Sequence, residues 1–177
     1  MTKNELEITP STTVHNLLKE YPELEDKLIG LAPPFKKLRN PALRNSVAKV
    51  ATLKHIASVG NIPLAELINN IRNEVGQPVS PEAFESEDYF TAKPDWFSTD
   101  KITVSLVEGE VGDKDKMTVV AVLREAKKLK SGEIIELITT FLPAPGIDSM
   151  TAKGYSVWTT KSDGDTIRTY FMKDFET

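Results

Sequence analysis

The sequence predicts an α+β protein with two domains, an N-terminal all-α bundle of short helices and a C-terminal two-layer sandwich of helices on a sheet. Two observations support this division. Apolar residues recur at spacings of three and four up to Val75, whereas from Ile102 they alternate with polar residues. The stretch between is rich in proline and acidic residues, which is typical of a linker. We therefore predict a helical domain at 1–76, a Pro-rich acidic linker at 77–100 and a sandwich domain at 101–177.

Five short helices are predicted in the helical domain, because each apolar run follows a capping residue or a proline. Pro33 and Pro34 are expected to break the chain after the second helix, and Gly60 and Gly76 to end the last two. The residues expected at the helix starts are Ser11 or Thr12, Pro22, Pro41, Thr52 and Ile62. The residues expected in one shared core are Val14, Leu17, Leu18, Leu24, Leu28, Ile29, Leu31, Leu43, Val47, Val50, Leu53, Ile56, Val59, Leu64, Leu67, Ile68 and Ile71.

The linker carries more aromatic side chains than a solvated tether needs. They are Phe84, Tyr89, Phe90, Trp96 and Phe97. We therefore expect part of the linker to dock on one of the domains.

From Lys101 the periods predict the order strand, helix, strand, helix, strand, strand, with both helices on one face of a four-stranded sheet. A Pro-Ala-Pro-Gly turn is expected before the second helix. The expected strands are 102–107, 133–141, 155–160 and 166–173, and the expected helices are about 117–130 and 147–153. The inward residues of the first of these helices are expected to be Val119, Val122, Leu123, Ala126 and Leu129.

The chain has no cysteine and only two histidines, His15 and His55. A thiolate nucleophile, a disulfide, an iron–sulfur cluster and a cysteine-bound zinc ion are therefore excluded. Phosphate-binding loops and the common hydrolase and metal-helix motifs are also absent, so we expect no catalytic residues, no metal and no cofactor. No apolar run reaches about 18 residues, and we expect a cytoplasmic protein without a membrane anchor.

The helical half resembles a family of short domains of unknown function that is grouped with the redox-disulfide domains associated with hybrid-cluster proteins. The resemblance covers about residues 8–75 and is carried by Thr13-Val14, 18–24 (LKEYPEL), 35–44 (FKKLRNPALR) and 50–53 (VATL). Redox members of this group place a cysteine pair after the second helix, where this chain has Gly30-Leu31-Ala32-Pro33-Pro34. The redox role is therefore not implied for this chain.

The second half resembles uncharacterised relatives of the TusA/SirA-like sulfur carriers. The resemblance is carried by 94–97 (PDWF), 129–133 (LKSGE), 141–148 (FLPAPGID), 153–155 (KGY) and 169–173 (TYFMK). It implies a TusA/SirA-like sandwich fold. Sulfur carriers of this kind have a Cys-Pro pair at the start of their first helix, where this chain has Asp113-Lys114-Asp115-Lys116-Met117-Thr118. Persulfide transfer is therefore excluded.

Charge is distributed unevenly between the halves. Residues 1–77 hold 10 basic and 8 acidic residues, whereas 78–177 hold 12 and 18. No acidic residue occurs within 27–65, and the region around Pro41 is strongly basic. The bases expected to bind an acidic protein partner or a small anionic ligand are Lys36, Lys37, Arg39 and Arg44. The alternative is a solvated or domain-docking surface in which these bases pair with the linker or with Glu20, Glu23, Glu25 or Asp26.

The turn at 141–146 follows a strand and precedes a helix, a position where α/β folds often bind ligands. The residues expected to line a pocket or grip a partner are Phe141, Pro143, Pro145, Trp158 and Tyr170. The alternative is that these residues only pack against Trp96 and Phe97 of the linker.

Residues 53–72 have the apolar rhythm of a helix-turn-helix, which a tight helix pair of any function also gives. Asn69, Asn70 and Arg72 are the candidates for contacts with DNA, but Glu66 and Glu74 would repel the phosphates. The acidic sequence pI of 5.3 also disfavours nucleic acid as a partner.

The sequence therefore predicts a two-domain cytoplasmic accessory protein that acts by binding rather than by catalysis. One alternative is an enzyme that uses carboxylate, lysine or tyrosine groups at the domain junction, and converging titratable groups in a deep pocket would favour it. A weak helix-turn-helix-like nucleic-acid binder is another. A regulatory subunit of a redox complex is suggested by family association alone.

Overall fold

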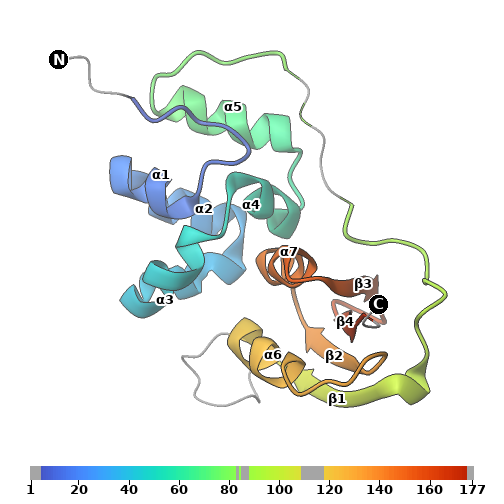
Figure 1. The fold of residues 1–177 in the computed structure, drawn as a ribbon. Coiled ribbons are helices and arrows are strands. Elements are labelled where there is room, and N and C mark those ends of the chain that lie inside the picture. Colours follow the sequence, from blue (N-terminus) through green and yellow to red (C-terminus); the bar gives the residue numbers. More distant parts are fainter. Residues whose placement is uncertain (1–4, 83, 85–87, 109–117, 175–177) are drawn as a thin grey trace. The chain divides into compact units, whose positions relative to one another are not determined.

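The computed structural model describes residues 5–82, 84, 88–108 and 118–174. The chain divides into two compact units, Met1–Glu87 (unit 1) and Asp88–Thr177 (unit 2). Helices make up unit 1, and unit 2 holds a four-stranded mixed sheet with helices (Figure 1). The predicted α+β class is confirmed.

The described residues of unit 1 form five α-helices, with short 3-10 helices between some of them. The Thr13 hydroxyl accepts the Asn16 N–H at 3.2 Å and begins α1, and the Thr52 N–H donates to Nδ1 of His55 at 3.0 Å at the start of α4. Asn61 ends α4 in the left-handed conformation, with φ of 52°. The elements are α1 (Val14–Glu20), η1 (Pro22–Leu24), α2 (Glu25–Leu31), η2 (Pro33–Arg39), α3 (Pro41–Ser46), η3 (Val47–Lys49), α4 (Leu53–Gly60) and α5 (Leu64–Glu74).

The core of unit 1 contains most of the residues that the helical periodicity selected, with one clear error. Val50 is 59% exposed, so its predicted place in the core is wrong. The α-helical period stops at Ser46, and in the 3-10 turn that follows Ala48 takes the buried position. The expected core residue Leu43 lies outside the side chains that the structure describes.

Segments on both sides of the helices complete unit 1. Arg72 of α5 donates from Nε and Nη2 to the Ile8 carbonyl at 3.0 and 2.8 Å. Residues from the predicted linker also join this unit: Gln77 Nε2 donates to the Leu6 carbonyl at 2.7 Å, and Phe84 packs against the core. Part of the predicted linker therefore docks on the helical unit.

The sheet of unit 2 has the strand order β1-β2-β4-β3, in which β1 and β2 are parallel and the other two pairs are antiparallel. Leu106, Leu137 and Phe171 of the sheet form one core with α6 and α7. Both helices therefore cover the same face. The elements are η4 (Thr99–Lys101), β1 (Ile102–Val107), α6 (Thr118–Ala126), β2 (Ile134–Thr139), α7 (Ala144–Ala152), β3 (Tyr155–Lys161) and β4 (Ile167–Lys173).

Two helix boundaries in unit 2 differ from the sequence prediction by three or more residues. Helix α7 begins at Ala144, so most of the expected Pro-Ala-Pro-Gly turn forms its first turn. Proline is compatible with that position because the first N–H groups of a helix have no intrahelical partner. Helix α6 ends at Ala126, four residues before the expected end at Lys130. The expected start at Met117 and the expected inward side chain of Val119 lie outside the described part of the chain.

Within the described part of the chain, no helix combines the length and the apolar composition that a membrane crossing requires.

Candidate functional site

The predicted basic residues cluster around the 3-10 helix η2. Phe35 and Leu38, three positions apart, are buried on one face of this helix. The residues between and after them, Lys36, Lys37 and Arg39, are exposed. The local structure therefore anchors the segment through its apolar residues and presents its bases to solvent.

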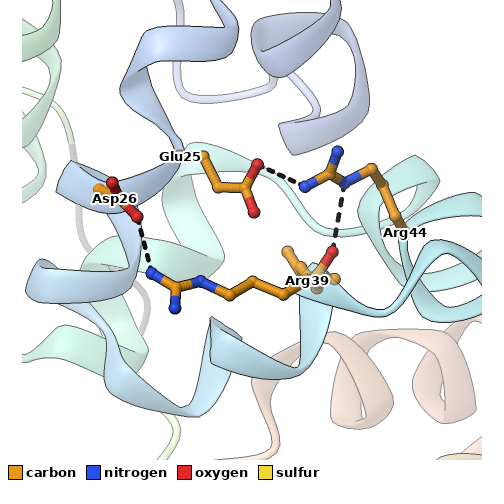
Figure 2. A network of polar contacts seen from close by, with 5 residues as sticks. Glu25, Asp26, Arg39 and Arg44 are labelled. Carbon is orange, nitrogen blue, oxygen red and sulfur yellow. Dashed lines mark hydrogen bonds and ion pairs between the residues drawn. The ribbon is translucent and has the colours of Figure 1, made fainter.

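Two of the four predicted bases are held by carboxylates of α2 (Figure 2). Arg39 Nη2 donates to Asp26 Oδ1 at 2.7 Å, and Arg44 Nη2 donates to Glu25 Oε2. Arg44 also donates from Nε to the Leu38 carbonyl at 3.2 Å, which fixes α3 beside η2. The pairing with Glu25 and Asp26 that the sequence offered as an alternative is therefore present.

These ion pairs leave the arginines accessible. The Arg39 side chain is 53% exposed and the Arg44 side chain 38%. A guanidinium has five N–H donors, so one or two bonds to a carboxylate leave further donors for another acceptor. Helix α3 has only six residues, and we assign no anion site to its N-terminus.

The five residues predicted around the Pro-rich turn do not come together. Pro143 lies with Leu137 and Phe171 on the helix-covered face of the sheet, and Phe141 and Pro145 flank it on the same connection and are half-buried. Trp158 and Tyr170 pair across β3 and β4 and belong to a separate cluster. The two groups lie on different faces because alternate residues of a strand point to opposite faces of a sheet.

Residues 88–101, which we call the aromatic strap, bridge the edge strand β3 at Phe90 and place Trp96 and Phe97 against the second face of the sheet. Phe97 contacts Trp158 and Tyr170, with ring centroids 4.7 and 4.4 Å apart. Trp158 and Tyr170 are themselves stacked at 5.3 Å with an angle of 18° between the rings. The packing of these two side chains against linker aromatics, which the sequence analysis gave as an alternative, is therefore observed.

A polar network on the same face was not predicted. Glu136 accepts hydrogen bonds from the Ser105 hydroxyl and from Arg168 Nη1, both at 2.6 Å, and from the Tyr170 hydroxyl at 3.2 Å. The only sequence signal is an acidic residue inside the apolar strand β2. Its partners depend on the strand register, which the sequence did not reveal.

The network is electrostatically satisfied. Partial burial acts to raise the pKa of Glu136, but the hydrogen bonds from Ser105 and Arg168 outweigh it and hold that pKa below its ordinary value. Burial, together with the nearby Glu136 charge, raises the pKa of Tyr170. A carboxylate with a lowered pKa is a weak base and a tyrosine with a raised pKa is a weak acid, so this arrangement favours structure over proton transfer.

The candidate DNA-contacting residues of α5 hold neighbouring segments instead. Asn69 donates from Nδ2 to the Ser80 carbonyl at 2.8 Å and accepts the Ser80 N–H at 3.1 Å. Arg72 is bonded to Ile8, as described above. Of the three candidates only Asn70 is exposed, so the geometry gives no support to a recognition helix.

The two histidines do not form a metal site with other residues. His55 is buried in the core of unit 1 and accepts the Thr52 N–H, and His15 is half-buried on α1. Among the residues that the structure describes, no three His, Cys, Asp or Glu side chains are grouped so that they could hold an ion.

A family model described as "Domain of unknown function (DUF1858)" matches residues 8–68, which extend from the segment before α1 into α5. The match supports an N-terminal domain similar to that family. No curated protein and no solved structure matches the chain.

Proposed function

We propose that the protein is a two-domain accessory protein that acts by binding, and that unit 1 recognises an acidic segment of a partner protein. The proposed contact residues are Lys36, Lys37, Arg39 and Arg44. The observation that carries this proposal is the outward presentation of three basic side chains within four residues of η2, whose residues Phe35 and Leu38 are buried in the core.

The arginine geometry supports the proposal. Two hydrogen bonds, to Glu25 and to the Leu38 carbonyl, orient Arg44, so less of its side-chain entropy is lost when a partner carboxylate binds. The surrounding charge also supports it, since residues 27–65 contain seven bases and no acid. All seven of these bases, which include the four proposed residues, lie at exposed or half-buried positions.

For unit 2 we propose a TusA/SirA-like sandwich that has given up sulfur chemistry. The order of its elements and the location of both helices on one sheet face support this assignment. A cytoplasmic location belongs to the same proposal and is supported by the cysteine-free composition.

The test uses a fluorescently labelled oligoglutamate peptide and the full chain. We expect the peptide to bind the wild-type protein, with an affinity that falls as salt is raised. Charge reversal of the two lysines, Lys36→Glu with Lys37→Glu, should lower the affinity by about tenfold or more, because like charges at an interface repel. Neither lysine takes part in the ion pairs of Arg39 with Asp26 and of Arg44 with Glu25.

The matched control is Lys153→Glu with Lys161→Glu, which changes two exposed lysines in unit 2 and alters the net charge by the same amount. It should leave peptide affinity close to the wild-type value. Equal affinities for the variant of Lys36 and Lys37 and for the control would refute the proposed surface. Competition by inorganic phosphate at low concentration would instead identify a small anion as the ligand.

A further inference from the structure

We propose that the face of the sheet carrying Trp158 and Tyr170 is a binding slot for an aromatic side chain of an extended partner segment, and that Phe97 of the aromatic strap occupies this slot in the free protein. The strap would then be autoinhibitory. This site lies in unit 2 and is independent of the proposed surface on unit 1.

The sheet places the two residues of the slot side by side. Trp158 lies directly opposite Tyr170 in the β3–β4 ladder, and Tyr170 lies opposite Glu136 in the β2–β4 ladder. The Tyr170 hydroxyl is further held by its bond to Glu136 at 3.2 Å. The strand pairing therefore places Trp158 beside Tyr170, and the bond to Glu136 holds Tyr170, without any contribution from Phe97.

The orientation of the Phe97 ring resembles that of a bound aromatic ligand. Its ring makes angles of 62° with Trp158 and 59° with Tyr170, so it is inclined to both rings rather than continuing their stack. Ile134 and Met172 lie in the same cluster and supply apolar contact. The slot therefore selects a flat apolar side chain.

The remaining contacts of the strap are those of a bound peptide. Phe90 forms a single parallel bridge with Thr159 of the edge strand β3, and the Trp158 indole N–H donates to the Thr91 carbonyl at 3.0 Å. The Tyr89 hydroxyl donates to the Asp148 carboxylate at 3.1 Å. An extended segment beside a sheet edge, with an anchor side chain in a pocket, is a general mode of peptide recognition.

The strap has less regular backbone structure than the strands that carry Trp158 and Tyr170. Apart from the short helix η4 at its end, it has no regular secondary structure beyond the one bridge at Phe90, and Phe90 itself is 39% exposed. Segments with few backbone bonds and partial burial open at lower free energy than the strands beneath them. A partner segment that carries an aromatic residue and a free carbonyl for Trp158 could therefore replace it.

The first experiment supplies the strap as a separate labelled peptide of residues 88–98 to the full chain. Phe97→Ala in the protein should empty the slot, so the peptide should bind this variant about tenfold or more tightly than it binds the wild-type protein, where the intact strap competes. The control peptide carries Phe97→Ala and should not bind. Equal binding of the peptide by both proteins, or no binding to the folded variant, would overturn the proposal.

If the Phe97→Ala variant does not fold, a second variant tests the same proposal. Tyr89→Phe removes the bond to Asp148 and leaves the slot residues unchanged, so a looser strap should raise peptide affinity severalfold over wild type. An affinity no higher than that of the wild-type protein would overturn the autoinhibitory role. Chemical-shift changes at the Trp158 indole on addition of the peptide should accompany binding, and their absence would contradict the assigned slot.

Discussion

The two faces of the sheet in unit 2 are buried by different kinds of structure. Helices α6 and α7 cover the face with Phe171, which is 1% exposed. The aromatic strap covers the face with Trp158, and its main contact residue, Phe97, is only half-buried. A helix opens cooperatively and rarely, whereas an irregular segment held by few bonds opens alone. Burial of a sheet face is therefore compatible with either a permanent core or a cover that can be displaced.

The largest effect is expected on the helix-covered face. Phe171→Ala should lower the free energy of unfolding of unit 2 by about 3–5 kcal/mol, because it removes a fully buried ring and leaves a cavity. Denaturant titration followed by circular dichroism measures this loss. If Phe171→Ala lowered the free energy of unfolding by less than Phe97→Ala does, the contrast between the two faces would be reversed.

A smaller loss is expected on the strap-covered face. Phe97→Ala should lower the free energy of unfolding by about 1–2 kcal/mol, since the ring is only partly buried and the strap can detach without exposing the helix-side core. The same titration measures it, and Trp fluorescence should change because Trp158 loses its neighbour. A loss equal to that of Phe171→Ala would mean that the strap is a permanent part of the core.

The polar network on the strap-covered face should give a pH-dependent contribution of about 1 kcal/mol. Because the pKa of Glu136 in the folded protein lies below its ordinary value of 4.5, the ionised carboxylate stabilises the fold above that pH. This stabilisation is lost as the pH falls through the lowered pKa. Glu136→Gln should therefore be less stable than wild type at neutral pH, and the difference should shrink in acid. A difference that does not change with pH would contradict the role of the charge.

The exposed ion pair of unit 1 gives the smallest expected effect. The Asp26 carboxylate is 86% exposed, so its pair with Arg39 should contribute no more than about 0.5 kcal/mol. A double-mutant cycle of Asp26→Asn and Arg39→Gln measures the coupling. A coupling energy larger than the stability loss caused by Glu136→Gln would show that the polar network on the sheet contributes less than this ion pair.

Periodicity was enough to predict the elements that bury a continuous apolar stripe. Helix α5 and strand β1 follow the ranges expected from their spacings of three to four and of two. The pattern failed where the backbone changes its period, as at Val50, which follows a 3-10 turn. It also failed at Ala144–Gly146, because prolines and a glycine in a first helical turn look like a loop in sequence.

The candidate site was less predictable than the fold, since it depends on contacts between distant residues. The basic residues of η2 could be found because they lie close together in sequence. The pairing of Glu136 with Arg168 requires the register of β2 and β4, and the slot for Phe97 requires knowing which sheet face the helices leave open. The aromatic residues of the linker indicated that part of it docks on a domain, but they did not indicate where.

Hydrogen exchange at the Trp158 indole tests the contrast between the faces most directly. This N–H donates to the strap at Thr91, whereas the backbone N–H of Phe171 lies in a central strand under the helices. If the strap opens independently of the sheet, the indole N–H should exchange with a clearly lower free energy than the Phe171 amide. Exchange of both groups only through global unfolding, at the same free energy, would contradict a displaceable cover.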